Sequence, residues 1–360
     1  MTLTTTTQIE GPVNFQFQVA LLRNAKALAP YFEGTEPAEI MQMGGTFSAK
    51  WRRIENLTPT TTPLAELTGA VSFPTRTATQ PTVTDITATV QKFGNFFHLN
   101  EEVDVVNFNG QAQKLSEVLG INAGQSLNRL QRNEMEDNSV AIFGGLGTGG
   151  TATAVAGAGI TESDIAATVN SLNNQDALKF TPMTEGNRNI NTTPIRMSYW
   201  GITHVDTEED LRQLTNFVAV ERYANQTETA PGEIGHVGGV RWIATTEASI
   251  DADSGATITG TSTGAGRTSA GTSYDVYNSV IYGRDAVGSL GFGFNHIKST
   301  YQAGDKLPGV MMIAKARGSA GAADPLDELA SLGWRSWHAA QILNSNWIRV
   351  VRHTSSKLAA

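Results

Sequence analysis

The longest helical pattern in the chain runs from residue 111 to residue 139. Apolar residues recur there at steps of three and four, at Leu115, Val118, Leu119, Ala123, Leu127 and Leu130. This spacing predicts a single helix whose apolar stripe faces a core. It leaves on the outer side Lys114, Glu117, Asn128, Arg132 and Glu136. At about 1.5 Å per residue the helix is on the order of 40 Å long, so a large body has to pack along it.

Gly120 and Gly124 lie four residues apart inside this helix. Each costs roughly 1 kcal/mol relative to alanine in a helix interior. Two interpretations are open: the glycines are merely tolerated, or another backbone comes close at this point.

The composition is polar but weakly ionic, because only 17% of residues are charged. Such a surface suits a protein whose faces are covered by neighbours, since lysine and glutamate are depleted at the centres of interfaces. It also fits extracellular β-rich proteins. The formal net charge of -8 argues against the broad basic face that non-sequence-specific DNA binding requires.

The chain has no cysteine, which excludes disulfides, thiolate zinc sites and a cysteine nucleophile. The first ten residues carry neither a basic nor an apolar stretch, so we predict no secretory signal. No window approaches 18 continuous apolar residues, and we predict no membrane span. We expect a soluble protein that assembles in a cytoplasm.

Residues 1–12 read as a mobile arm, and residues 13–33 as a short helix that stops at Pro30. The period then changes to two, which predicts paired half-buried strands at 46–52 and 82–90. The proline-rich segment between them has little apolar surface, and such long connections are unusual inside a compact domain. We infer an arm that projects onto another subunit; a disordered surface loop is the alternative.

The remaining chain alternates between strands and helices, which predicts an α+β lobe with a boundary near 145–160. Three phenylalanines at 92–99 are predicted to return to the core. Helices are expected at 161–178 and 207–214, strands at 195–204, 237–245, 276–282, 296–302 and 310–316, and an exposed low-complexity loop at 251–273. The segments 333–343 and 347–353 are predicted to form a hairpin that packs against the long helix.

The search for chemistry gives no enzyme signature. The glycine-rich stretch 144–150 lacks the Lys-Ser/Thr of a phosphate loop, so it is a turn. Asp251, Asp253 and Gly255 resemble the start of a calcium loop, but its twelfth position is Ser262, and the site is rejected.

His204 with Asp206 could be ligands or an acid-base pair, although a histidine beside an acidic helix start is more often structural. The carboxylate run at 208–210 reads as a solvated helix start. No close spacing relates the other histidines, His98, His236, His296, His338 and His353. We predict no catalytic, cofactor-binding or metal-binding residues.

The order of these elements resembles the major capsid proteins of tailed bacteriophages, with the Hong Kong 97 type fold, in a podovirus-type branch. The segments that carry the resemblance span about 36–352, and they are PLAELTG (63–69), TDITATVQKFGNFF (84–97), LNRL (127–130), HVDTEEDLRQL (204–214), GEIGHVGGVRW (232–242), YGRDAVG (282–288) and DPLDELASLGWRSWHAAQIL (324–343).

The resemblance implies an α+β fold with four parts. These are an N-terminal arm (1–45), an extended β-hairpin loop (46–91), a peripheral domain (92–145 and 296–360) that contains the spine helix 111–139, and an axial domain (146–295). Some relatives cross-link neighbours through a lysine on the extended loop, but this chain has no lysine between Lys50 and Lys92. We therefore expect no such cross-link.

The implied function is self-assembly as pentamers and hexamers into an icosahedral head shell that encloses double-stranded DNA without sequence-specific binding. A separate scaffolding protein is expected, because the chain has no large N-terminal scaffolding segment. A portal protein and a cement or decoration protein are further expected partners. The implied location is the virion, after assembly in the host bacterial cytoplasm. The alternatives are a non-viral compartment shell, or a surface or adhesion protein.

Overall fold

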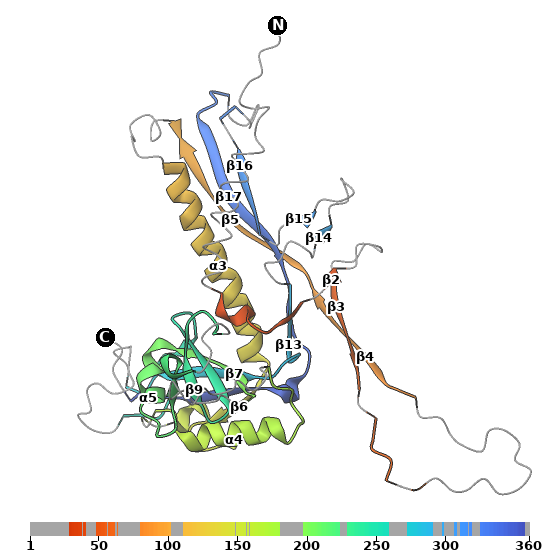
Figure 1. Ribbon diagram of the computed structural model, residues 1–360. Coiled ribbons are helices and arrows are strands. Elements are labelled where there is room, and N and C mark those ends of the chain that lie inside the picture. Colours follow the sequence, from red (N-terminus) through yellow and green to blue (C-terminus); the bar gives the residue numbers. More distant parts are fainter. Residues whose placement is uncertain are drawn as a thin grey trace, which may run out of the picture.

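The computed structural model describes residues 29–37, 39–40, 48–55, 57–61, 63, 80–101, 111–147, 149–155, 157, 159–180, 197–223, 229–258, 272–290, 297–298, 306–307, 310–315, 317–318 and 325–356. A long helix, α3 (Gln111–Asp137), runs beside an extended sheet and ends at a mixed lobe, while a two-stranded ribbon leaves the junction at an angle (Figure 1). The predicted arm 1–12 and most of the predicted helix 13–33 lie outside the described residues.

The sheet beside α3 has the strand order β16-β17-β5. Its strands are β16 (Val310–Lys315), β17 (Leu329–His338) and β5 (Gln91–Asn100), all antiparallel. The helix packs on one face of this sheet, where Leu119, Ala123 and Leu127 meet Leu332 and Trp334. The predicted helix and the centre of its apolar stripe are confirmed.

Three details of the stripe are wrong. Val118 is half exposed, whereas Asn128 and Glu136 are buried. The reason is that α3 is covered on two sides: the sheet lies along its middle, and the lobe and residues 29–37 enclose its last turns. Of the three phenylalanines predicted in the core, Phe96 is exposed, because it points to the opposite face of β5 from Phe93 and Phe97.

The lobe is built on an eight-stranded sheet with the order β6-β19-β12-β7-β10-β9-β8, to which β11 adds beside β12. The bounds are β6 (Val140–Phe143), β7 (Tyr199–His204), β8 (Val218–Ala219), β9 (Glu233–Val237), β10 (Val240–Thr245), β11 (Ile250–Asp251), β12 (Val276–Tyr282) and β19 (Ile348–His353). The pairs β10–β7 and β19–β6 are parallel.

Both faces of this sheet are covered, which explains why β7 and β12 are buried along nearly their whole length instead of alternating. Helices α4 (Glu162–Asn173) and α5 (Glu208–Arg212) cover one face. Met135 of α3, and Tyr31 from residues 29–37, contribute to the core on the other face. The helix predicted at 161–178 is present as α4, and Thr161 and Asp164 form a capping box at its start.

The predicted C-terminal hairpin is wrong. β17 pairs with β16 and β5, β18 (Ala340–Ile342) pairs with β13 (Val287–Ser289), and β19 pairs with β12 and β6. The chain changes sheet twice in this region because each segment finds its partner elsewhere. Of the predicted packing against α3, β17 contributes Leu332 and Trp334.

The remaining elements are short. They are the 3-10 turns Pro30–Phe32, Ala152–Ala154, Val205–Thr207, Val220–Arg222 and Ser345–Trp347, and the strands β1 (Glu36–Pro37), β2 (Glu39–Ile40), β14 (Ile297–Lys298) and β15 (Lys306–Leu307). Most of the predicted strand 296–302 and much of the predicted loop 251–273 lie outside the described residues.

Candidate assembly surface

The projecting ribbon consists of β3 (Ser48–Ile54) and β4 (Val83–Thr89), paired antiparallel from Ser48↔Thr89 to Ile54↔Val83. Beyond that pair, the amide of Glu55 donates to the carbonyl of Thr82 at 2.9 Å. The predicted strands and their pairing are confirmed. In the part of the chain that the structure describes, β4 lies at the edge of a sheet ordered β2-β3-β4. Its outer backbone groups can therefore accept another strand.

The root of the ribbon is packed where the lobe meets the sheet β16-β17-β5. Ala49, Trp51, Ala88 and Val90 form a core with Leu290, Ala339 and Leu343. Trp51 lies on Gly288 of β13, where a side chain would collide with its indole. The alternating pattern read from the sequence thus buries one face of the ribbon only at its root.

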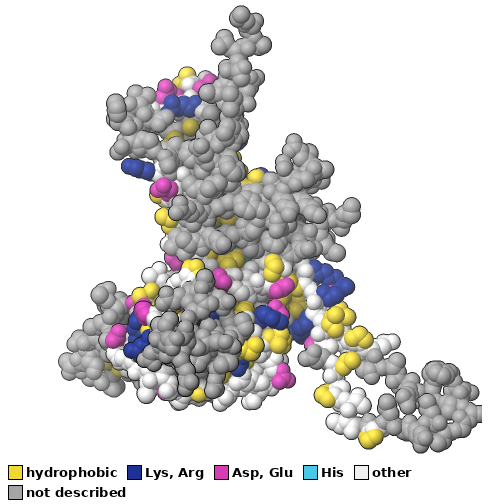
Figure 2. Space-filling view, in the orientation of Figure 1, with side chains coloured by type: hydrophobic (Ala, Val, Ile, Leu, Met, Phe, Trp, Pro, Cys, Tyr) yellow, Lys and Arg dark blue, Asp and Glu magenta, His cyan; other side chains and the backbone are white. Residues whose placement is uncertain are grey.

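The opposite face of the ribbon carries an ion cluster. The Lys50 ammonium and the Arg52 guanidinium lie 2.7 and 2.8 Å from the two carboxylate oxygens of Asp85. The hydrogen bonds from Arg52, then from Lys50, hold the pKa of Asp85 well below its usual value. Figure 2 shows dark blue side chains gathered at this point of the ribbon, with yellow apolar side chains further out. Because Lys50 and Arg52 share one carboxylate, the cluster retains a positive charge.

Arg53 fixes the ribbon to the body. Its Nη1 donates to the carbonyl of Leu343 at 2.8 Å, and its Nη2 lies 2.6 Å from Glu55. Thr84 also donates to Glu55, at 3.2 Å. The Arg53–Leu343 bond ties the outer part of β3 to the loop after β18, and the bonds to Glu55 join β3 to β4 there, so the direction in which the ribbon projects is set by the fold.

The outer end of the ribbon exposes large apolar side chains. Ile54 and Val83 face each other across the two strands and are 65% and 49% exposed, and Leu57 is 54% exposed. Exposure of such an apolar cluster to water is unfavourable, and clusters of this kind mark sites of contact with other proteins. We interpret the outer ribbon as a contact surface for another subunit.

Residues 29–37 act as a strap between the spine helix and the lobe. The Tyr31 amide donates to Asn128 at 3.1 Å, the Tyr282 hydroxyl donates to the Glu33 carbonyl at 2.7 Å, and β1 pairs in parallel with β13. The Tyr31 hydroxyl reaches Glu136 of α3 at 3.4 Å, and Ser249 of the lobe donates to the same carboxylate at 2.5 Å. Burial raises the pKa of Glu136 to about 7.

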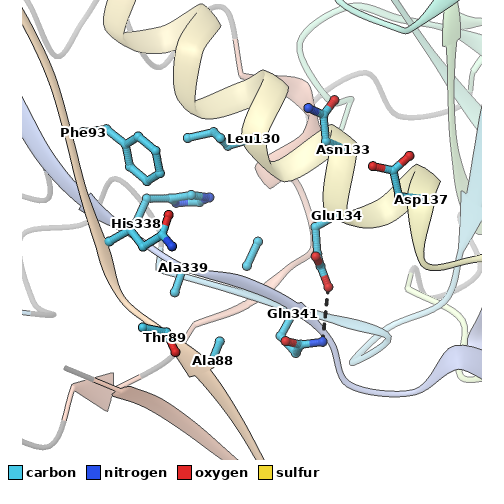
Figure 3. Close-up of a pocket in the computed structure, with 12 residues that line it drawn as sticks. Ala88, Thr89, Phe93, Leu130, Asn133, Glu134, Asp137, His338, Ala339 and Gln341 are labelled. Atoms are coloured by element: carbon cyan, nitrogen blue, oxygen red, sulfur yellow. Dashed lines mark hydrogen bonds between the residues drawn. The ribbon is translucent and has the colours of Figure 1, made fainter. Parts of the chain in front are cut away.

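A cavity of about 360 Å³ opens where the ribbon root, α3 and the β17–β18 link meet (Figure 3). Glu134 and Asp137 project from α3, and His338 lies across from them beside Phe93. Gln341 donates to Glu134 across the cavity at 3.2 Å. Burial lowers the pKa of His338 to about 4, so this imidazole is neutral near pH 7. No feature of the sequence marks this cavity, because its walls come from three distant segments.

The candidates considered for chemistry have structural roles. His204 Nδ1 accepts from the Asp206 amide at 3.2 Å at the start of the turn before α5, and burial lowers its pKa. Asp251 accepts from Asn278 at 3.0 Å, and Asp253 accepts from the Ser273 amide at 3.0 Å. Among the described residues, no three His, Asp or Glu side chains are grouped as a metal site requires.

The remaining predicted features are likewise explained by packing. In the glycine-rich turn, the Gly145 amide donates to Asp164 at 2.8 Å, which joins the turn to the start of α4. His353 and Ser279 are in hydrogen-bond contact at 2.7 Å, but both are fully buried in the lobe. Within the described ranges, no helix is long and apolar enough to cross a membrane.

Residues 83–352 match the family described as phage capsid protein. Comparison with curated proteins gives no match. The capsid of Ralstonia phage GP4 is similar with a TM-score of 0.58 and 10% identity, over 88% of this chain and 86% of that one.

Two further solved structures have the same fold. The head structure of Helicobacter pylori bacteriophage KHP40 is similar with a TM-score of 0.53 and 9% identity, over 91% of each chain. The capsid structure of cyanophage P-SCSP1u is similar with a TM-score of 0.50 and 11% identity, over 90% of this chain and 88% of that one. At such low identity the structures establish the fold alone.

Proposed function

We propose, from the premise that the chain belongs to the phage capsid protein family, that its copies assemble as pentamers and hexamers into the icosahedral shell around double-stranded DNA. Membership of this family makes the chain a structural protein of the phage head shell, and hence part of the virion. The expected capsid fold is confirmed.

The observation that carries the assembly proposal is the ribbon. It leaves the body of the subunit, exposes Ile54, Leu57 and Val83 at its outer end, and has an open β4 edge within the described residues. An isolated two-stranded ribbon is only marginally stable in water. Lying on a neighbouring subunit would remove the apolar cluster from water and stabilise the ribbon.

The division of the chain into an arm (1–45), an extended loop (46–91), a peripheral domain (92–145 and 296–360) and an axial domain (146–295) belongs to the same proposal. Residues 29–37 bind both the spine helix and the lobe, which favours a subunit whose domains move together. The strands β6 and β19, at the ends of the peripheral segments, extend the lobe sheet and join the two domains. Strong joining of this kind suits a shell subunit that transmits load to its neighbours.

The proposed partners are a separate scaffolding protein, the portal protein and a decoration protein, with assembly in the bacterial cytoplasm. The acidic balance of the chain supports contact with DNA without sequence-specific binding. A compartment shell outside phages, or a surface protein, has lost support because the matched family is a phage capsid family.

The test is electron microscopy with sedimentation of the full chain, alone and with candidate scaffolding proteins. Closed shells, or sheets of hexamers, are the expected result in at least one condition. Uniform shells from the chain alone would remove the need for a scaffold. A monodisperse monomer in every condition would contradict self-assembly.

A further inference from the structure

The ribbon meets the body of the subunit through alternate residues of β3. Ala49 and Trp51 are buried at the root, Lys50 and Arg52 are exposed on the other face, and Arg53 follows Trp51 on the body side. Trp51 and Arg53 are two residues apart, so their contacts with the body lie about 7 Å apart along the strand. The first contact fixes where the ribbon begins, and the second fixes the direction in which it leaves.

The partner of Arg53 is a backbone group that the lobe holds in place. Arg53 Nη1 donates to the Leu343 carbonyl at 2.8 Å. The Leu343 amide donates in turn to the Ala286 carbonyl at 2.8 Å, and the Leu343 side chain is buried at the ribbon root. Leu343 directly follows β18, which pairs with β13. The acceptor of the Arg53 bond therefore belongs to the body and not to the ribbon.

The same guanidinium is tied to both strands of the ribbon. Its Nε and Nη2 donate to Glu55 Oε1 at 2.9 and 2.6 Å, and Thr84 of β4 donates to the same oxygen at 3.2 Å. The bonds from Arg53, more than that from Thr84, hold the pKa of Glu55 below its usual value. A planar guanidinium donates in several fixed directions at once, which an ammonium group does not. Arg53 thus joins β3, β4 and the body in one rigid group.

A small change of angle at this point becomes large at the outer end of the arm. Residues 54–82 join Arg53 to Val83, and half of that length spans at most about 50 Å when fully extended. At such a distance a rotation of about 10° displaces the end by up to about 9 Å. That displacement is nearly twice the spacing of about 4.8 Å between paired strands, so a contact with a neighbouring subunit would be lost or shifted.

We propose that Arg53 is a positioning residue for shell assembly: by holding the ribbon to Leu343 at one angle, it sets the angle between neighbouring subunits and hence the curvature of the shell. This inference rests on the proposed function. Rings of subunits are built from head-to-tail contacts between two different surfaces, and they close only when every contact repeats the same rotation. A ribbon that pivots at Trp51 gives a range of rotations, and hence shells of mixed size or open sheets.

The first measurement is the ribbon angle in the unassembled full-length chain. The chain has no cysteine, so spin labels attach only at Thr82→Cys on the ribbon and Asn170→Cys on α4, both exposed positions. Double electron–electron resonance then gives the distribution of the distance between the two labels. We expect a single narrow distance in the labelled chain and its loss in Arg53→Met. Arg53→Lys keeps the charge but not the fork of donors, so its distribution should be intermediate.

The matched control is Arg52→Met, which removes the neighbouring arginine from the opposite face of the same strand, where it pairs with Asp85. Its label distances should equal those of the chain with Arg52 in place. Because Glu55 is 39% exposed, loss of its cation costs little, and Arg53→Met should keep its unfolding midpoint. Equal broadening in Arg52→Met and Arg53→Met, or none in Arg53→Met, would overturn the proposal.

The second measurement is the size of shells under the conditions in which the wild-type chain assembles. Electron microscopy of unlabelled Arg53→Met should show that the single shell diameter is lost, whereas Arg52→Met should keep it. Shells of one wild-type size from Arg53→Met would overturn the role in curvature, even if the ribbon angle had broadened. If no chain assembles, the wild type included, the proposed function fails, and the label distances still decide whether Arg53 holds the ribbon.

Discussion

The indole of Trp51 in the ribbon lies directly on the backbone of Gly288 in β13, and a Cβ on Gly288 would come within 2.6 Å of the indole Nε1. The same nitrogen points to the Glu36 carbonyl, at 3.4 Å. One contact therefore joins the ribbon, the lobe and the strap. Since no side chain fits between the indole and β13, this position requires glycine.

We predict that Gly288→Ala destabilises the ribbon root. The added methyl group must displace Trp51 from its buried place, and overpacking of this kind costs about 1–3 kcal/mol in free energy of unfolding. Urea unfolding followed by tryptophan fluorescence measures the loss. Gly149→Ala is the matched control, because a Cβ there meets no atom within 4 Å and the residue is exposed. Equal stability of the two variants would contradict the contact.

Glu136 should make stability depend on pH. Its pKa is raised from 4.5 to about 7 in the folded chain, chiefly by burial. The folded state therefore holds a proton that the unfolded state releases, so the free energy of unfolding is highest below pH 4.5, falls as the pH rises to about 7, and is constant above. This difference in pKa corresponds to at most about 3 kcal/mol in free energy of unfolding. The figure already includes the attraction of Arg132, which lowers the pKa.

We expect Glu136→Gln to remove this fall, because glutamine keeps the shape and the hydrogen-bonding capacity without a charge. The facing groups are Arg132 and Ser249, with Tyr31 and Asp251 beside them. Unfolding by urea at pH 5 and pH 8 measures the difference, and Glu117→Gln serves as the exposed control. If the stability of the variant declined between these pH values as steeply as that of the wild type, the pH dependence would not come from Glu136.

The lobe contains a buried ion pair that should tolerate no single change. Arg241 Nη2 lies 2.6 Å from Glu233, both side chains are nearly inaccessible, and the guanidinium lies 4.6 Å from the Trp200 ring. Arg241→Met leaves a buried carboxylate without its cation, which costs about 3–5 kcal/mol. The double variant Arg241→Met, Glu233→Leu should recover part of that loss.

Thermal and urea unfolding of these variants test the argument. The control is the exposed pair of Arg212 and Glu208, four residues apart on α5, where Arg212→Ala should cost only about 0.3–0.5 kcal/mol. Comparable losses at the two pairs would show that burial does not govern the cost.

Local patterns predicted local structure well. The two-residue period around Trp51 predicted the ribbon, and the helix expected at 161–178 begins within one residue of the start of α4. Those patterns depend only on which neighbours in sequence share a face. The C-terminal hairpin was wrong because a short turn cannot reveal that β17 and β19 each find a better partner in a different sheet.

The candidate surface was predictable in part. The proline-rich segment indicated an arm. That the outer end of the ribbon exposes the apolar side chains of Ile54 and Val83 became evident only from the structure. The cavity could not be predicted, because Glu134 and His338 are separated by most of the lobe sequence. Likewise, a polar residue on a helix gives no sign of burial until its second partner is known, as Glu136 illustrates.

Deleting residues 58–80 should separate folding from assembly. The Glu55–Thr82 backbone bond and the Ile54↔Val83 pair flank the deleted segment and are kept, so Asn56, Leu57 and Pro81 would form a hairpin loop of ordinary length. Shortening a loop costs folded domains little. The root contacts of Trp51 and Arg53 are untouched, so the subunit should keep its unfolding midpoint.

Shell formation by this deletion variant should nevertheless fail, because the outer arm no longer reaches a neighbouring subunit. Electron microscopy and sedimentation measure the yield of closed shells, and the unfolding midpoint verifies the fold. The matched control replaces 58–80 by a Gly/Ser linker of equal length, which keeps the reach but removes the side chains. Loss of shells in both variants would place the contact in the side chains of the arm. Normal shells from the deletion would show that the arm does not hold neighbours together.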